Sequence, residues 1–179
     1  DIPPLIEARK KGIETVGEME FAWRYLRSIP WVGVTGTNGK TTVTSLVGAI
    51  FQTAGFNAPT CGNIGNAASQ IAIEEGNKET RGQGDKETRG QGDKEEKNSF
   101  PSLDWIIAEL SSYQIESSNS ITPKIGIWTT LTPDHLARHK TVENYYNIKA
   151  QLLHRSQMQV FNGDDPYLRQ VGETDWKDA

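Results

Sequence analysis

A glycine-rich turn between a strand-like and a helix-like segment constrains the fold of this chain more than any other feature. Residues 31–35 (Trp-Val-Gly-Val-Thr) are apolar and β-branched and lie between Pro30 and Gly36, which predicts a buried strand. Residues 41–54 carry apolar side chains at three- and four-residue steps and end before Gly55, which predicts a helix. A strand that enters a helix through such a turn is typical of a phosphate-binding loop, because backbone N–H groups and the helix N-terminus both attract an anion.

The residue types in this turn suit the phosphates of ATP. The turn consists of Gly36, Thr37, Asn38, Gly39, Lys40, Thr41 and Thr42. The glycines let the backbone approach the phosphates, Lys40 can reach the terminal phosphates, and the Thr41 hydroxyl can bind Mg²⁺. The common motif has glycine six residues before the lysine, where this chain has Val34, so the loop is a shorter G-x-x-G-K-T-T variant. The turn predicts ATP and Mg²⁺ as cofactors; the alternative is a chance Gly/Thr turn.

Helical and strand-like patterns alternate along the rest of the chain. Further strands are predicted at residues 104–110, 124–129 and 157–161, and further helices at residues 17–27, 66–75 and 141–156. Asp164 and Asp165 are expected to make a turn and cap a helix. This alternation predicts an α/β fold of the P-loop NTPase type, with a mostly parallel sheet and helices on both of its faces.

One internal segment departs from this pattern. Residues 78–85 (Lys-Glu-Thr-Arg-Gly-Gln-Gly-Asp) repeat without change as residues 86–93, and residues 76–98 contain no apolar side chain. Such a segment has nothing to bury that would offset the entropy of ordering it. Residues 76–98 are therefore predicted to be a flexible insertion. Pro3 and Pro4 favour an irregular start to the chain.

Composition excludes several classes of protein. The net charge is −4 and no basic stripe stands out, which argues against nucleic acid as a partner. Cys61 is the only cysteine, so a disulfide framework or a cysteine zinc site is not expected. No apolar run approaches the roughly 18–20 residues that span a bilayer, and the first residues do not resemble a signal peptide. A cytoplasmic protein with no membrane partner is expected.

Four further motifs follow the phosphate loop in a specific order. They are residues 62–65 (Gly-Asn-Ile-Gly), 109–114 (Glu-Leu-Ser-Ser-Tyr-Gln), 132–139 (Thr-Pro-Asp-His-Leu-Ala-Arg-His) and 144–149 (Asn-Tyr-Tyr-Asn-Ile-Lys). Together they resemble the Mur ligase family, and the second motif resembles its D-glutamate-adding branch. These ligases use ATP to activate a carboxylate as an acyl phosphate, which an amine then attacks.

The resemblance implies a domain organisation and a set of partners. Residues 1–30 would be a lead-in segment from a preceding domain, and residues 31–179 a central ATP-binding domain that is incomplete at its C-terminal end. The substrates would be UDP-N-acetylmuramoyl-L-alanine and D-glutamate, joined during peptidoglycan synthesis, and the full-length enzyme would be a monomer. Position 137 departs from the family pattern, since alanine stands where the family commonly has Asp or Asn.

Three residues are candidates for catalysis and metal binding beside Lys40 and Thr41. Glu109 ends a predicted strand, at the sheet edge where ligands bind, and a carboxylate there suits Mg²⁺; the alternative is a surface carboxylate. His135 lies in a loop and the resemblance implies that it binds metal or the activated carboxyl group; the alternative is a loop histidine bonded to Asp134. Lys149 matches the lysine that the family carbamylates with CO₂ into a metal ligand; the alternative is a solvated helix lysine.

Three polar residues are candidates for substrate binding. The resemblance implies that Asn63, Ser111 and Gln114 contact the substrate, and their amide and hydroxyl groups suit that role. The alternative for each is a turn or helix-capping residue. His139 and His154 have no such support and are predicted to lie on the surface.

Other functions stay open from the sequence. One is a nucleotide-binding module without ligase activity, and another is a family member that adds a different amino acid or resembles folylpolyglutamate synthase. A kinase or GTPase is a third possibility, although the Thr-Lys-x-Asp motif with which a GTPase reads its base is absent.

Overall fold

A five-stranded, wholly parallel sheet forms the centre of the molecule. The structure is a computed structural model that describes residues 2–87 and 102–176. The strands are β1 (Trp31–Thr35), β2 (Thr60–Gly62), β3 (Ile106–Glu109), β4 (Ile125–Trp128) and β5 (Met158–Phe161), in the order β2-β3-β1-β4-β5. The expected α/β class is confirmed, and the strands predicted around residues 31, 104, 124 and 157 all form.

Strand β1 occupies the middle of the sheet. It pairs with β3 on one side and with β4 on the other, with Val34 opposite both Glu109 and Ile127. All five residues of β1 are buried, as expected for a central parallel strand. Because parallel strands end at the same edge, the loops that follow β1, β3 and β4 converge there.

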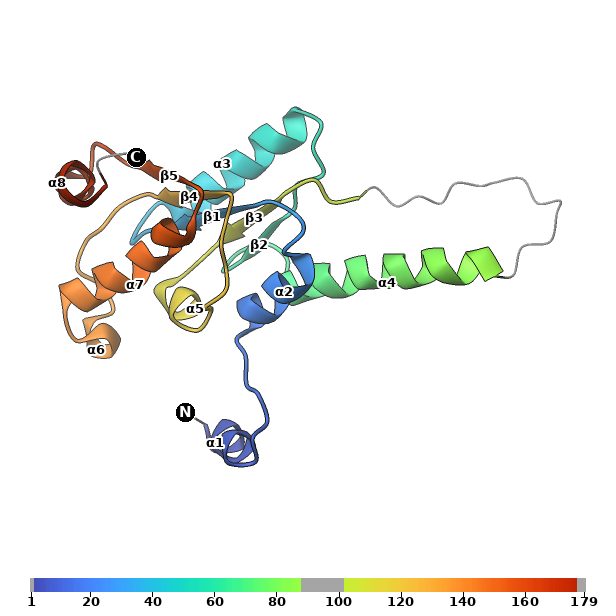
Figure 1. The fold of residues 1–179 in the computed structure, drawn as a ribbon. Helices are drawn as coiled ribbons and strands as arrows, with labels where there is room; N and C mark the ends of the chain where they lie inside the picture. Colours follow the sequence, from blue (N-terminus) through green and yellow to red (C-terminus); the bar gives the residue numbers. More distant parts are fainter. Residues whose placement is uncertain (1, 88–101, 177–179) are drawn as a thin grey trace.

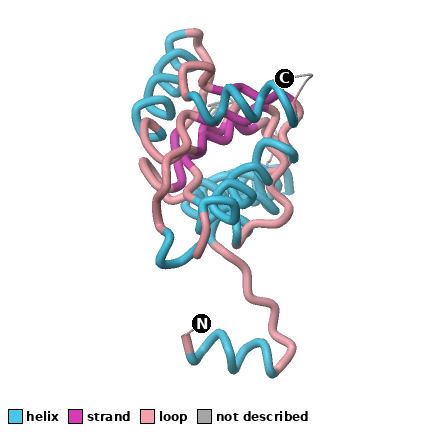
Figure 2. The backbone as a smooth tube through the Cα atoms, turned by 90° about the vertical axis from the view of Figure 1, so that its left-hand side faces the viewer, coloured by secondary structure: helices cyan, strands magenta, loops and turns pink. Residues whose placement is uncertain are grey.

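Helices cover both faces of the sheet (Figures 1 and 2). The helices are α1 (Pro3–Lys10), α2 (Glu18–Leu26), α3 (Lys40–Thr53), α4 (Ala68–Glu87), α5 (Ser112–Glu116), α6 (Leu136–His139), α7 (Val142–Arg155) and α8 (Pro166–Asp175). On one face, Val43, Val47 and Phe51 of α3 pack against Val32 and Val34. The larger core lies on the other face, where residues of α2, α4, α5, α7 and α8 pack against the sheet.

Helix α4 extends further than the sequence pattern predicts. The helix was expected to end near residue 75, but it continues to Glu87, so residues 76–87 are helical rather than a flexible insertion. Residues 88–98 of that insertion lie outside the described part of the chain. Ala68, Ile71 and Ala72 anchor the first turns in the core. Because adding a turn to a formed helix costs less than starting one, the Lys, Glu, Gln and Arg residues that follow can continue it.

Four elements are short and were not expected. Helix α1 forms where an irregular start was predicted; its prolines stand at the first helical positions, which tolerate proline, and it buries no residue. Figure 1 shows α1 joined to the remainder by an extended segment. Strand β2 has three residues, and α5 and α6 are single turns, too short for a periodic pattern to reveal.

Strand β2 contains the single cysteine. Cys61 is fully buried opposite Ala108 of β3, and burial raises the pKa of its thiol to about 12. Among the helices of residues 2–87 and 102–176, none is long and apolar enough to cross a membrane.

Asp165 joins α8 to the loop that follows β4. One carboxylate oxygen accepts hydrogen bonds from the backbone N–H groups of Tyr167 and Leu168, both at 3.0 Å. The other oxygen accepts one from the backbone N–H of Leu131, also at 3.0 Å. The expected turn and helix cap are confirmed, and the cap also fixes a loop at the edge where the strands end.

We expect Asp165→Ala to lower the free energy of unfolding by about 2 kcal/mol, because it removes a helix cap and leaves a buried N–H without its acceptor. Urea unfolding followed by circular dichroism measures the loss. Asp164→Ala is the matched control, since that side chain is fully exposed and should change stability by less than about 0.5 kcal/mol. Equal losses in the two variants would contradict the capping role.

Candidate active site

The phosphate loop begins at the end of β1 and runs into α3. Gly36 has φ 151° and Gly39, the N-cap of α3, has φ 78°, and side chains rarely adopt either conformation. A Cβ on Gly36 would also fall on the hydroxyl of Thr129. Both glycines are therefore required, and the strand–turn–helix context predicted for residues 31–54 is confirmed.

Two threonines after β4 clamp the phosphate loop from the side. The hydroxyls of Thr129 and Thr130 donate to the carbonyl of Asn38 at 2.5 and 3.1 Å. The N–H of Asn38 donates to the Thr130 hydroxyl at 2.9 Å, and that of Thr37 donates to the Thr130 carbonyl at 2.9 Å. This clamp was not predicted from the sequence; the signal for it is a pair of hydroxyl residues directly after an apolar strand.

Thr37 connects the loop to two more distant segments. Its hydroxyl donates to the carbonyl of Thr132 at 3.1 Å and accepts from the N–H of Thr132 at 3.1 Å. The same hydroxyl lies 3.3 Å from the phenol oxygen of Tyr145, a buried residue of α7. The phosphate loop is thus tied to the segment that carries His135 and to the helix that carries Lys149.

Two lysine ammonium groups meet at one carbonyl oxygen. Lys40 donates to the carbonyls of Gly36 and Thr37 at 3.0 and 2.9 Å. Lys149 donates to the same Gly36 carbonyl at 2.8 Å and to the Thr35 hydroxyl at 3.3 Å. Its Nζ also lies 4.7 Å from the centre of the Tyr145 ring. The structure therefore brings together two residues that the sequence places 109 positions apart.

Lys149 is buried more deeply than its position beside an apolar helix face suggests. Its side chain is 1% exposed, which rules out the alternative of a solvated lysine. Burial and, to a smaller extent, the positive charge of Lys40 together lower its pKa to about 7. A large fraction of Lys149 is then a neutral amine near pH 7, the form that can act as a nucleophile.

Glu109 carries a carboxylate oxygen without a protein partner. Its side chain is 1% exposed; one oxygen accepts from the side-chain amide of Asn63 at 3.0 Å, and the other has no hydrogen-bond partner among the described residues. The N–H of Asn63 also donates to the Glu109 carbonyl at 3.0 Å. Buried polar atoms are rarely left unpaired, so this oxygen suits a cation such as Mg²⁺, which prefers oxygen ligands.

His135 lies nearby but is not packed into a ligand cluster. It is half exposed; its backbone N–H donates to one carboxylate oxygen of Asp134 at 2.7 Å, and its ring Nε2 lies 3.4 Å from the other oxygen. Its ring faces Tyr113, with centres 5.5 Å apart. Within residues 2–87 and 102–176, no three His, Cys, Asp or Glu side chains lie close enough together to hold a metal ion by themselves. The metal-binding role of His135 stays a prediction, and its contact with Asp134 matches the alternative.

Ser111 and Gln114 cap helix α5 with each other. The backbone N–H and hydroxyl of Ser111 both donate to the Gln114 amide oxygen at 2.9 Å, and the N–H of Gln114 donates to the Ser111 hydroxyl at 3.3 Å. This capping box is the alternative that the sequence left open. Their role in substrate binding stays a prediction. Thr41 and Thr42 are exposed in the first turn of α3, where a phosphate can reach them.

The prediction for His139 was wrong, whereas that for His154 is confirmed. His139 is 4% exposed, its Nε2 lies 2.9 Å from the Ser112 hydroxyl, and burial lowers its pKa. His154 is exposed and stacks on Trp176, with ring centres 4.0 Å apart. The local sequence does not predict this difference, because the buried His139 stands between Arg138 and Lys140, whereas the exposed His154 directly follows two leucines.

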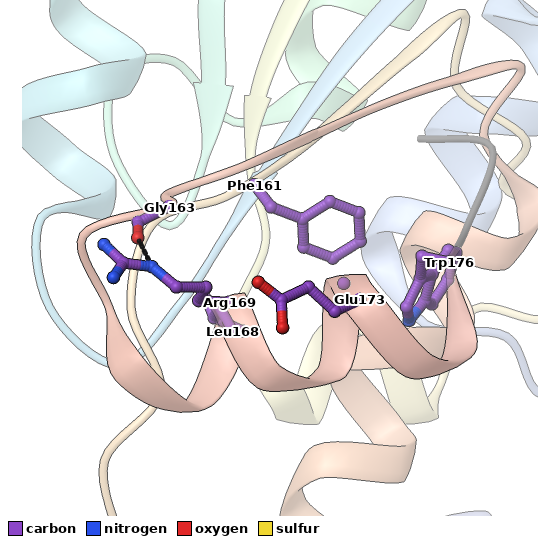
Figure 3. Close-up of a pocket in the computed structure, with 7 residues that line it drawn as sticks. Phe161, Gly163, Leu168, Arg169, Glu173 and Trp176 are labelled. Carbon is purple, nitrogen blue, oxygen red and sulfur yellow. Dashed lines mark hydrogen bonds between the residues drawn. The ribbon is translucent and has the colours of Figure 1, made fainter.

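A separate hollow of about 420 Å³ lies between the end of β5 and α8 (Figure 3). Its walls are formed by Phe161, Gly163, Leu168, Arg169, Gly172, Glu173 and Trp176. None of these is a predicted site residue, and β5 is one of the two edge strands of the sheet.

Comparison with known proteins decides the family. The sequence profile of the Mur ligase middle domain matches residues 34–177. The chain belongs to the Mur ligase family. It is 61% identical to the UDP-N-acetylmuramoylalanine–D-glutamate ligase of Nostoc punctiforme and 59% identical to that of Microcystis aeruginosa. All of the chain is matched in both cases, but only 37% and 34% of the relatives, so the chain spans about a third of their length.

Solved structures of Mur ligases share the fold. The ligase that joins UDP-N-acetylmuramate to L-alanyl-γ-D-glutamyl-meso-diaminopimelate in Neisseria meningitides has a TM-score of 0.62 at 15% identity, and the match covers 94% of this chain and 50% of that one. A MurF ligase from Thermotoga maritima in complex with ADP has a TM-score of 0.56 at 18% identity, over 83% of this chain and 32% of that one.

The burial of Lys149 predicts a pH-dependent stability that Lys149→Met should remove. Because the folded-state pKa is about 7 and the ordinary value is 10.5, the wild type keeps its full stability only above the ordinary value. Between these two values the unfolded chain binds a proton at Lys149 that the folded state does not bind. Folding must therefore release this proton, which costs more free energy as the pH falls toward 7. We therefore expect the wild type to lose stability relative to the variant by up to about 1.4 kcal/mol per pH unit, with a plateau below the folded pKa.

Urea unfolding between pH 6 and 9.5 in CO₂-free buffer measures this difference, with the exposed Lys124→Met as a control for loss of a lysine. A difference between wild type and Lys149→Met that stays constant with pH would contradict the assignment.

Proposed function

We propose that the chain is the central domain of an ATP-dependent ligase that joins D-glutamate to UDP-N-acetylmuramoyl-L-alanine, a cytoplasmic step of peptidoglycan precursor synthesis carried out by a monomeric full-length enzyme. The observation that carries the proposal is the pairing of Lys40 and Lys149 at the end of the phosphate loop, in a chain about 60% identical to relatives that bear this ligase name.

The phosphate loop would hold the ATP phosphates. Gly36, Asn38 and Gly39 shape the backbone, and the N-terminus of α3 with the exposed Thr41 and Thr42 would contact the phosphates. Lys40 donates hydrogen bonds to two carbonyls of its own loop. When ATP binds, it would replace these two hydrogen bonds by hydrogen bonds to phosphate oxygens. Thr37 contributes mainly through the framework, because its N–H and hydroxyl are already engaged there.

Mg²⁺ would be held by Thr41 and by the unpaired oxygen of Glu109, with His135 and a carbamylated Lys149 as further ligands. When bound, Mg²⁺ supplies charge neutralisation on the phosphates during phosphoryl transfer. Asn63 holds the Glu109 carboxylate in one orientation by its amide, which leaves the second oxygen directed away from that bond.

Carbamylation of Lys149 would convert a cation into an anionic ligand. The neutral amine nitrogen attacks the carbon of CO₂, a proton leaves to water, and the product is a carbamate of charge −1. The lowered pKa of Lys149 supports this step, because only the neutral amine reacts. The change of sign would also remove the repulsion between the two lysines and give Lys40 an anionic neighbour.

Substrate binding would use the polar groups at the ends of β2 and β3. Asn63, Ser111 and Gln114 would contact UDP-N-acetylmuramoyl-L-alanine, and His135 its carboxylate. That carboxylate would attack the γ-phosphorus of ATP and displace ADP, which gives an acyl phosphate. The neutral amine of D-glutamate would then attack the acyl carbon, phosphate would leave, and the nitrogen would lose a proton to solvent. In this scheme the domain acts by positioning and by neutralising charge.

A second candidate is a nucleotide-binding domain without ligase activity, for which the phosphate loop by itself would be sufficient. Addition of another amino acid, as in other Mur ligases or folylpolyglutamate synthase-like enzymes, is the remaining alternative. Both are distinguished by the experiments below.

We expect Lys40→Ala to abolish measurable ATP binding by the chain, because it removes the cation that would contact the terminal phosphates. Isothermal titration with ATP and Mg²⁺ measures this, and Lys124→Ala, at the opposite edge of the sheet, is the matched control. An unchanged ATP affinity in Lys40→Ala would contradict the assignment of residues 36–42 as the phosphate loop.

Ligase activity is tested in a chimera in which the chain replaces the matching segment of the Nostoc punctiforme ligase. We expect ADP release only with UDP-N-acetylmuramoyl-L-alanine and D-glutamate together, and none in the Lys40→Ala chimera. ATP binding without ADP release would support the second candidate, and release with a different amino acid would support the third.

A further inference from the structure

The turn that carries His135 has an unusual backbone. Helix α6 is a single turn, and the residues on both sides of it adopt a positive φ: His135 has φ 52° and is left-handed, and Lys140 has φ 68° with ψ −46°. Residues with side chains rarely do so, and each such residue costs about 1 kcal/mol or more. This geometry persists only where neighbouring contacts hold it, so the contacts of α6 decide where His135 lies.

The last residue of the turn supplies the buried contact. His139 is 4% exposed and its Nε2 is 2.9 Å from the hydroxyl of Ser112, which is 2% exposed. Its ring lies between those of Tyr113 and Tyr145, at 5.5 and 5.3 Å. Its carbonyl accepts a hydrogen bond from the Asn144 side chain at 3.2 Å.

The remaining residues of α6 face solvent. Leu136, Ala137 and Arg138 are exposed. Arg138 makes an ion pair with Glu116 of α5 at 2.8 Å, but both side chains are exposed, and such pairs contribute little. His139 is the one buried residue of α6, and it makes the buried contact between α6 and α5.

The bond to Ser112 reaches the segment that carries the other site residues. Ser112 is the first residue of α5, next to Ser111 and three positions after Glu109. Tyr113, the following residue, faces both His135 and His139 at 5.5 Å. The hydrogen bond between His139 and Ser112 is thus the buried one that joins the segment after β3 to the segment after β4.

We propose that His139 is a positioning residue, whose buried hydrogen bond to Ser112 holds the α6 turn against α5 and thereby places His135 at the site. The catalytic importance of this placement rests on the proposed function, whereas the placement itself does not. A side chain that only filled the core could be replaced by phenylalanine, but a positioning bond needs a polar atom at Nε2.

Four variants of the chain separate these roles. His139→Phe keeps a ring and removes the bond, Ser112→Ala removes the other partner, and His139→Gln keeps a polar group at the same reach. His154→Phe is the control, because that histidine is exposed and stacks on Trp176. The first readout is the NMR signal of the His135 Cε1–H group, assigned by substitution, together with melting temperatures.

We expect His139→Phe and Ser112→Ala to move the His135 signal toward that of an unstructured histidine, and His139→Gln and His154→Phe to leave it near its wild-type position. A wild-type His135 signal in both His139→Phe and Ser112→Ala would overturn the proposal. The proposal would also be overturned if the His135 signal stayed at its wild-type position in His139→Phe but shifted in His139→Gln.

The second readout is kinetic and uses the chimera with the Nostoc punctiforme ligase. We expect kcat to fall about ten-fold or more in His139→Phe and Ser112→Ala, since a misplacement of about 1 Å can cost up to 100-fold, with the KM for ATP unchanged. His139→Gln should restore kcat to within about three-fold. An inactive wild-type chimera would count against the proposed function, while the NMR readout would still decide the positioning role.

Discussion

The carbonyl oxygen of Gly36 accepts hydrogen bonds from two lysine ammonium groups, and much of the site depends on this shared acceptor. Lys40 comes from the first turn of α3 and Lys149 from the middle of α7, so the contact joins helices on opposite faces of the sheet. Two like charges at one oxygen repel each other, and water is largely excluded from Lys149. The arrangement favours the neutral form of Lys149 or the binding of an anion nearby. Either a phosphate or a carbamate would supply the negative charge.

The sequence pattern predicted the elements that have a local cause. Strand β1 and helix α3 follow from an apolar β-branched run, a glycine turn and a helical period, and the same rules located β3, β4, β5 and α7. Strand β2 has only three residues and α5 and α6 one turn each, so no period exists from which to predict them. Helix α4 is longer than predicted. Composition alone does not show that its first turns are anchored in the core, from which the helix can continue.

The residues of the site likewise fall into those that the sequence predicted and those that it could not predict. The phosphate loop could be predicted because its glycines and lysine are adjacent in sequence, and the family resemblance added Glu109, His135 and Lys149. The burial of His139 and the clamp of Thr129 and Thr130 on Asn38 could not be predicted, because they arise where separate strands end together. A polar residue that is buried by the tertiary fold looks like any polar residue in the chain.

The burial of Cys61 makes the thiol an internal reporter of opening at the sheet edge. A thiol whose pKa is near 12 is almost entirely protonated at neutral pH, and it is shielded from reagents in the native fold. Alkylation would then require β2 to separate from β3, beside the turn that holds Asn63 against Glu109. The alkylation rate would follow the free energy of that local opening, independently of global unfolding. Ligands that contact both Asn63 and Glu109 should slow the alkylation of Cys61. The alkylation rate would therefore report how often β2 separates from β3 beside the site.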